Sequence, residues 1–288
     1  MNRSFAAVAI LSLCAAPLAG QGGGAAQSPF RQAIREASRL DSDGKHAEAR
    51  ARFQQLIDSA STPADRAVAQ RRMAMSYGFT GDCASAIKYE EMVIAYWVTR
   101  EREEPQNAFY QQGEMANEAA RVCIDAGHLD EAERMYKRGA ELGNKEPEPR
   151  THPKSLWDYR TAHAMARLAA RRGNKTEAER QVAAARRALD ADTAMARQQE
   201  RFFPYLVGYV ALFTNDLKKA EAELTRSLAM EGNNDDPFQH VLLAMTYEKQ
   251  GRADEAKAMY QKAYDLSGGH NPPAVFSRPF ARKKLGGS

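Results

Sequence analysis

The histidines and cysteines are the residues of this sequence with the chemistry for metal binding or nucleophilic catalysis. No two histidines stand in a His-Glu-x-x-His pattern, which would place two ligands on one helical face. The sequence also has no Gly-x-Ser-x-Gly elbow, no dinucleotide-binding glycine pattern and no paired cysteine cluster. We therefore expect a non-catalytic protein without a metal or a cofactor. The six histidines are scattered along the chain, at His46, His128, His152, His163, His240 and His270.

One set of basic side chains has a spacing that suits the binding of acidic groups. Arg160, His163, Arg167 and Arg171 lie three or four positions apart, which places them on one face of a helix. Guanidinium groups hold carboxylates through paired hydrogen bonds. The set therefore predicts a surface for an acidic partner, and a merely solvated helical face is the alternative.

A set of aromatic side chains with the same spacing follows further along the chain. Phe202, Tyr205, Tyr209 and Phe213 would supply a large and stiff contact area to a bound partner. Burial in the core is the alternative, because the residues between them are also apolar and make this helix apolar nearly all round.

A six-residue sequence that occurs six times identifies the elements that position these side chains. Each copy starts with Gly, or once with Asn, ends with Ala, and has an apolar pattern of helical period on both sides. The first residue suits the left-handed conformation that ends a helix, and the Ala lets two antiparallel helices approach closely. Polar residues between them, such as Asp130 and Asn174, suit the start of the second helix. The copies are 44–49, 81–86, 127–132, 173–178, 215–220 and 251–256.

In these features the chain resembles the tetratricopeptide repeat family. The family signature is a large residue, then Leu, Gly or Ala, Tyr, and later Ala and an aromatic residue. The second copy departs from it at Glu90, where the aromatic residue of the second helix is expected. The last copy matches it best, with Leu243, Ala244, Tyr247, Gly251, Ala256 and Tyr260.

The resemblance implies an all-α fold, a right-handed α-solenoid of about six helical hairpins over residues 30–267. Stacking of neighbouring hairpins would form the core, because one hairpin cannot bury its own apolar face. We expect residues 268–288 to form a short amphipathic cap on the last hairpin.

In this family the first helix of each hairpin lines the concave face, where peptide segments bind. The resemblance therefore implies a protein-binding scaffold or adaptor, and we expect its partner to be an acidic segment with apolar anchors in another exported protein. A self-associating structural protein and an enzyme on a helical-repeat frame are the alternatives. The expected concave-face residues are Arg71, Met75, Phe79, Asn117, Arg121, Arg160, His163, Arg167, Arg171, Phe202, Tyr205, Tyr209 and Phe213.

The N-terminal residues predict export to the periplasm or the cell exterior. Residues 1–20 combine one Arg, an apolar run and small residues, as in a cleaved secretory signal peptide, and residues 21–29 form a Gly-rich linker. No later apolar run reaches the length of a membrane span. The formal net charge of +4 gives no case for a nucleic-acid partner.

Two cysteines, Cys83 and Cys123, remain once the signal peptide is removed. They would stand in an oxidising compartment and toward the same edge of two adjacent hairpins. A disulfide between them and two separate buried thiols are both consistent with these positions.

Overall fold

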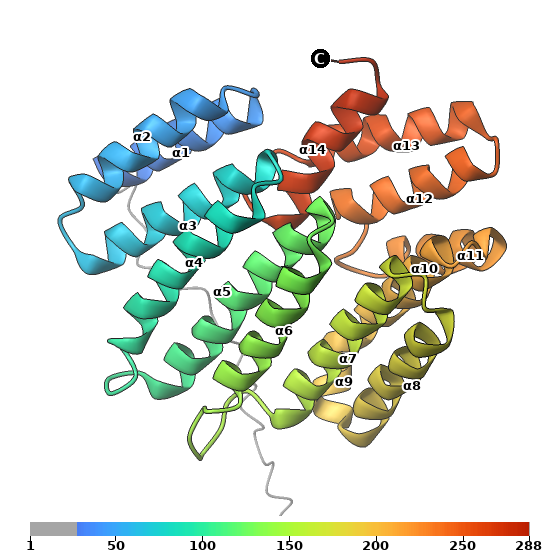
Figure 1. The fold of residues 1–288 in the computed structure, drawn as a ribbon, viewed down its shortest axis with the longest axis horizontal. Helices are drawn as coiled ribbons and strands as arrows, with labels where there is room; N and C mark the ends of the chain where they lie inside the picture. The colour runs from blue at the N-terminus through green and yellow to red at the C-terminus, as the bar shows by residue number, and fades with distance from the viewer. Residues whose placement is uncertain (1–27, 288) are drawn as a thin grey trace, which may run out of the picture.

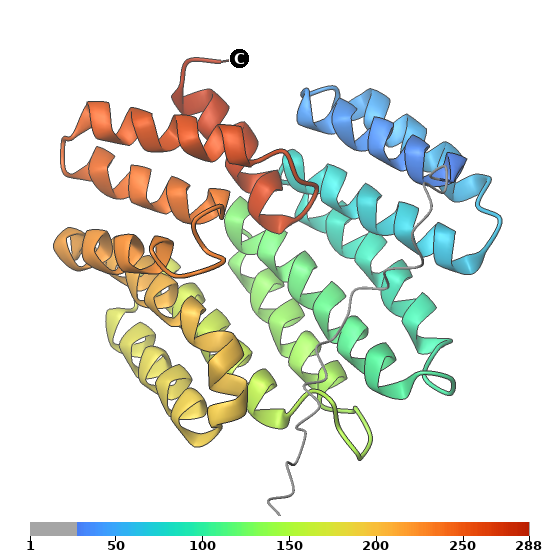
Figure 2. The ribbon, with the colours of Figure 1, turned by 180° about the vertical axis from the view of Figure 1, so that it is seen from behind.

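The computed structural model describes residues 28–287 as a stack of helical hairpins (Figures 1 and 2). These residues contain no strand, and the predicted all-α solenoid of six hairpins is confirmed. The expected signal peptide and residues 21–27 of the expected linker lie outside the described residues. The hairpins are α1 (Pro29–Ser42) with α2 (His46–Asp58), α3 (Pro63–Phe79) with α4 (Cys83–Val98), α5 (Pro105–Ala126) with α6 (Leu129–Gly143), α7 (Lys154–Arg171) with α8 (Lys175–Ala191), α10 (Phe203–Phe213) with α11 (Leu217–Leu228), and α12 (Pro237–Lys249) with α13 (Ala253–Leu266).

The six recurring sequences form the turns of these hairpins. The first residue of every copy has a positive φ, between 64° and 90°, and Asn215 is the only residue other than Gly with this conformation among residues 28–287. The final Ala of each copy is at most 4 % exposed, as close helix packing requires. Asn174 accepts a hydrogen bond from the backbone of Glu177 and so caps α8. Asp130 lies in the first turn of α6 and pairs with Arg172 instead.

The fourth and fifth hairpins are joined by an additional helical segment. α8 ends at Ala191, and Asp192 caps the short helix α9 (Thr193–Gln199) by accepting hydrogen bonds from the backbone amides of Ala194 and Met195. A 3₁₀ turn, η1 (Glu200–Phe202), then leads into α10.

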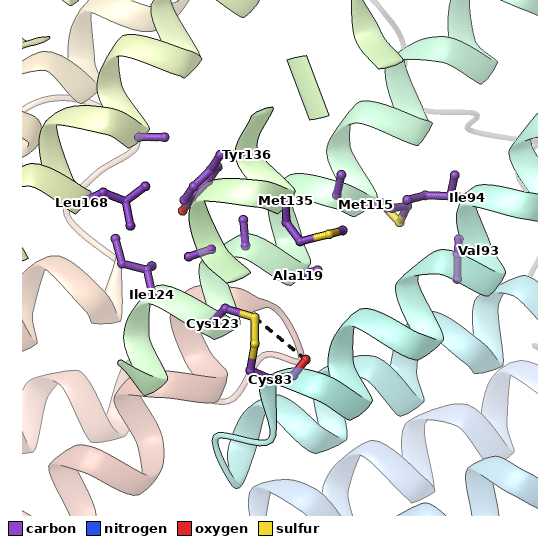
Figure 3. Packing of buried hydrophobic residues seen from close by; sticks show 14 of the residues in the cluster. Cys83, Val93, Ile94, Met115, Ala119, Cys123, Ile124, Met135, Tyr136 and Leu168 are labelled. Atoms are coloured by element: carbon purple, nitrogen blue, oxygen red, sulfur yellow. Dashed lines mark hydrogen bonds between the residues drawn. A yellow bond between two sulfur atoms is a disulfide. The ribbon is translucent and has the colours of Figure 1, made fainter. Parts of the chain in front are cut away.

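Apolar clusters shared by neighbouring hairpins form the core. The cluster in Figure 3 contains Met115 of α5, Met135 of α6 and Leu168 of α7, all nearly inaccessible. At its edge a disulfide joins Cys83 at the start of α4 to Cys123 of α5. The disulfide therefore links the second hairpin to the third. Within residues 28–287, none of the helices combines the length and the apolar character of a membrane span.

The C-terminal helix, α14 (Pro272–Lys284), contacts hairpins from both halves of the stack. It packs on α12 and α13, as the expected cap would, and it also contacts α3 and α5 (Figures 1 and 2). Val275 is 2 % exposed and shares an apolar cluster with Phe79 of α3 and Val122 of α5. The tail is therefore more than a cap on the last hairpin, because it covers part of the inner side of hairpins two and three.

Polar contacts with the first two hairpins hold the segment before α14. The buried carboxylate of Asp41 is hydrogen-bonded to His270 Nε2 at 2.9 Å, to His46 Nδ1 at 2.9 Å and to Ser76 Oγ at 3.0 Å. Arg72 Nη1 donates to the backbone carbonyl of His270 at 2.7 Å. A network of this kind fixes the position of the tail, because leaving Asp41 buried without these partners would be costly.

We expect Val275→Asp to detach α14 from the inner side of the stack. A carboxylate at this buried position would have no partner, and burying an unpaired charge is strongly unfavourable. Limited proteolysis should then cleave the link at Gly268 and Gly269 faster than in the parent protein. Lys283→Gln, at an exposed position of the same helix, is the control and should leave the cleavage rate unchanged. Equal cleavage of both variants would contradict the docking of α14.

Candidate functional site

A cavity of about 300 Å³ opens on the inner side of the third, fourth and fifth hairpins. The first helices of these hairpins, α5, α7 and α10, contribute most of its lining. Seven of the expected concave-face residues line it: Asn117, Arg121, Arg160, His163, Arg167, Phe202 and Tyr205.

Arg167 is the most unusual charged group in this cavity. The residue is 6 % exposed, and within residues 28–287 its guanidinium donates only to the hydroxyl groups of Tyr136 at 3.0 Å and Tyr205 at 3.3 Å. Its Nε has no partner among the described residues. Arg side chains stay charged in proteins, so the cavity contains a buried positive charge.

Arg121 and His163 lie on the same lining. Arg121 Nε donates to Asp125 at 2.9 Å, its guanidinium stacks over the ring of Phe238 at 3.9 Å, and its Nη2 has no partner among residues 28–287. Burial, together with the charges of Arg167 and Arg121, lowers the pKa of His163 well below its usual value of 6.5. His163 is therefore neutral at physiological pH, and the positive charge of the cavity comes from its arginines.

Two carboxylates of the lining are paired with arginines. Arg160 pairs with Glu114 at the mouth, and Arg71, which does not line the cavity, pairs with Glu118 through a 2.8 Å bond from its Nε. Both arginines are more exposed than Arg167. The mouth thus presents paired charges to solvent, while the floor has an excess of positive charge.

The aromatic set is largely buried, because α10 packs between neighbouring helices on several sides. Tyr209 is 1 % exposed and Tyr205 is 7 % exposed, and only Phe202 and Phe213 are half-buried. Arg171 lies beside this set, with Nη1 3.4 Å from the hydroxyl of Tyr209 and its guanidinium over Phe213. Tyr209, Phe213 and Arg171 do not line the cavity.

Met75 and Phe79 were expected on an open concave face, and the structure places them in the core. Met75 is 1 % exposed and Phe79 is 5 % exposed. The physical reason is the C-terminal tail: Phe79 lies against Val275 and 5.4 Å from the ring of His270. The inner face of the second hairpin is therefore occupied by the chain itself.

Some lining residues have no counterpart among the expected concave-face residues. Tyr159 directly precedes Arg160 on α7, so its place beside the basic set could have been read from the sequence. Tyr136 occupies the aromatic position of the second helix, which normally points into the core. Glu114 and Glu118 lie on α5 at helical spacing from Asn117 and Arg121. The remaining three come from the segment before α10 and from the tail, whose positions depend on contacts between distant residues: Gln199, Pro272 and Pro273.

Glu90 is buried close to this face without a hydrogen-bond partner. It is 0 % exposed, and neither carboxyl oxygen has a partner among the described residues. Burial and the nearby charge of Glu118 raise its pKa well above 4.5, although Arg71 acts in the opposite direction. Its surroundings therefore favour the neutral form of the carboxyl group.

We expect Glu90→Gln to stabilise the protein at neutral pH. Because the pKa of Glu90 is raised in the folded state, the folded chain retains a proton that the unfolded chain releases above about pH 4.5. The ionisable Glu90 therefore lowers the free energy of unfolding increasingly as the pH rises from about 4.5 toward the pKa of the folded state. Each pKa unit corresponds to about 1.4 kcal/mol. Urea unfolding should show a gain in the free energy of unfolding at pH 7 and little change at pH 4. Glu141→Gln, at an exposed position of α6, is the control. A pH-independent effect of Glu90→Gln would contradict a raised pKa of Glu90 in the folded state.

The arrangement suits the binding of an anion better than chemistry at a metal. Within residues 28–287, no group of three or more His, Cys, Asp or Glu side chains is placed to hold a metal ion. Arg121 and Arg167 both line the cavity, and their guanidinium nitrogen atoms are hydrogen-bond donors, which fit a carboxylate or a similar oxyanion.

Comparison with known proteins identifies the repeats. Tetratricopeptide repeat family models match residues 118–138 and 240–270. A crystal structure of TPR-like repeats, from a Podosopora anserina protein described as a putative kinesin light chain, is 18 % identical over 82 % of this chain and 94 % of its own, with a TM-score of 0.38. A structure of a single-substitution variant of the same protein is 18 % identical over 83 % of this chain and 94 % of its own, with a TM-score of 0.38. No curated protein matches the sequence. Tetratricopeptide repeat models thus match parts of the third and the sixth hairpin, and residues 28–287 have the stacked-hairpin architecture of a tetratricopeptide-like solenoid.

Proposed function

We propose that this protein is a non-catalytic scaffold that acts in the cell envelope or outside the cell and binds an acidic, partly apolar segment of another exported protein. Tetratricopeptide repeats are protein-interaction modules, which supports the general role. The cavity on the inner side of hairpins three to five carries the proposal, because arginines and aromatic rings converge there. Its mouth, around Arg160 and Phe202, is the part accessible to a protein partner.

Chemical complementarity supports an acidic segment with apolar anchors. The guanidinium of Arg160 would pair with a carboxylate of the partner in competition with Glu114, and Phe202 offers a half-buried ring for an apolar side chain. Because the tail covers the inner face of the second hairpin, the segment would bind along the third to fifth hairpins.

Binding of designed peptides tests the proposal directly. A fluorescent peptide of alternating acidic and leucine or phenylalanine residues should bind the full chain, and the same peptide with lysines at the acidic positions should not. Arg160→Glu should weaken binding by about tenfold or more, since charge reversal at a contact repels the partner. Arg172→Glu is the matched control, because Arg172 also pairs with carboxylates but does not line the cavity. Equal binding of both peptides, or an equal effect of both variants, would refute the proposal.

The disulfide supports the proposed location, since such bonds persist mainly in oxidising compartments. The export proposal itself rests on residues 1–20. Mass spectrometry of the protein from its native cells should find an N-terminus between Ala19 and Ala26, in the periplasmic or secreted fraction. Recovery of the protein from the cytoplasm alone, with residues 1–20 still present, would contradict the proposed export.

A further inference from the structure

A comparison of the arginines around the cavity shows one charge without a counter-ion. Arg121 is paired with Asp125, Arg160 with Glu114 and Arg71 with Glu118. Arg167 has no carboxylate within salt-bridge distance among the residues that the structure describes, and only tyrosine hydroxyls accept from it. The floor of the cavity therefore carries a net positive charge that is nine-tenths buried. Such a charge is costly unless an anion is held beside it.

Donors without a partner show where this anion would be held. Arg167 Nε and Arg121 Nη2 are both buried, and no described residue accepts a hydrogen bond from either atom. Both side chains line the cavity. A guanidinium group has five N–H donors, so each of these arginines keeps donors for a carboxylate in the cavity beyond the hydrogen bonds that it already makes.

The aromatic part of the lining favours a ligand with a flat, apolar body, and the two carboxylates of the lining, Glu114 and Glu118, are each paired with an arginine. The rings of Tyr159 and Tyr205 and the half-buried ring of Phe202 line the cavity beside the arginines. Aromatic rings prefer to pack against one another in offset or edge-on arrangements, so an aromatic body fits these walls. A volume of about 300 Å³ lies at the small end of the range for small-molecule sites.

The C-terminal tail limits the length of what can enter. Pro272 and Pro273 line the cavity on the side of the tail, and beyond them Val275 covers Phe79. The floor of the cavity is consequently not continuous with an open groove over the second hairpin. A short ligand fits this floor without crossing the tail.

We propose that the floor of this cavity, formed by Arg121 and Arg167, binds a small aromatic carboxylic acid as a free molecule. The carboxylate lies against the two guanidinium groups, and the ring packs among Tyr159, Tyr205 and Phe202. This inference goes beyond the proposed function, because the acid occupies the floor whether or not a protein partner docks at the mouth.

Isothermal titration calorimetry of the full chain with matched small molecules tests whether the floor of the cavity binds an aromatic carboxylic acid. 2-Naphthoate should bind with saturation. 2-Naphthamide, which has nearly the same shape without the charge, and acetate, which has the charge without the ring, should each bind about tenfold more weakly or worse, since each lacks one of the two kinds of contact. Naphthamide binding equal to naphthoate binding, or no naphthoate binding to correctly folded protein, would overturn the proposal.

Variants assign the site within the chain. Arg167→Gln should weaken naphthoate binding by about tenfold or more and leave naphthamide binding unchanged, because it removes charge and keeps hydrogen-bonding capacity. Phe202→Ala, which removes a half-buried ring of the lining, should weaken the binding of naphthoate and of naphthamide alike. This variant tests the site independently if Arg167→Gln fails to fold. Arg172→Gln, just past the end of the same helix, is the control and should bind naphthoate as the parent does.

The peptides described above separate this inference from the proposed function. Naphthoate binding without peptide binding would support the acid site and refute the peptide partner. Binding of the acidic peptide that is abolished by Arg167→Gln, in a protein that does not bind naphthoate, would assign the floor to a protein partner and overturn the inference.

Discussion

Loss of the disulfide between Cys83 and Cys123 is expected to lower the free energy of unfolding by about 4 kcal/mol. The two cysteines are 40 positions apart, and a cross-link over this distance removes that much conformational entropy from the unfolded chain at 25 °C. Both residues are buried at the contact between hairpins two and three, so the bond also couples the unfolding of these hairpins. A loss of this size is a large part of the stability of an ordinary domain.

The Cys83→Ala, Cys123→Ala double variant measures this effect in urea unfolding. Alanine is chosen because both positions are apolar and tightly packed. The parent protein with a reductant should approach the stability of the double variant, and the reductant should have no effect on the double variant itself. Reduction should add the mass of two hydrogens to the parent. A parent protein whose unfolding midpoint is insensitive to the reductant would contradict a stabilising disulfide.

Trp157→Ala is expected to lower the free energy of unfolding by about 3–5 kcal/mol, since it leaves a large cavity in a closely packed region. Trp157 of α7 is 0 % exposed. Its ring fills the space beside two glycines: a Cβ placed on Gly143 would lie 2.1 Å from the ring, and one placed on Gly113 would lie 2.3 Å from it. The indole ring therefore packs the fourth hairpin tightly against the third. Neighbouring side chains could fill little of the cavity that its removal would leave.

A graded series of substitutions tests this packing. Trp157→Phe should cost less than Trp157→Ala, because it keeps an aromatic ring and removes an indole N–H that has no partner among the described residues. Gly113→Ala should destabilise through overpacking by about 1–3 kcal/mol, despite the higher helix propensity of alanine. Gly268→Ala, with open space around it, is the matched control and should have little effect. An unchanged stability of Gly113→Ala would show that the contact with Trp157 is looser than described.

The recurring turns were predictable because they depend on local conformation. A residue that ends a helix in the left-handed region is usually Gly and sometimes Asn, and all six positions, including Asn215, adopt this conformation. The six alanines were predictable for a similar reason, since only a small residue allows two helices of a hairpin to meet so closely. The departure from the family pattern at Glu90 was visible as well, and it marks a buried carboxyl group.

The expected binding surface was only partly predictable. Helical spacing placed Arg160, His163 and Arg167 on one face, and they do line a single cavity. Spacing alone does not give the depth of a side chain, which is set by neighbouring helices. Arg167 is therefore buried while Arg160 reaches the mouth.

By itself, the sequence determined the repeat, the hairpin and the all-α class, because these follow from periodicity and turn conformation over a few residues. Only the tertiary structure decided which part of the inner face stays open. His270 bonds to Asp41 across 229 positions, and this contact brings the tail over Phe79 and next to the cavity. No local pattern encodes such a pairing, since it depends on the curvature of the whole stack. The same long-range geometry leaves Arg167 as a buried charge without a carboxylate partner in the part of the chain described, and that charge makes the cavity a candidate binding site.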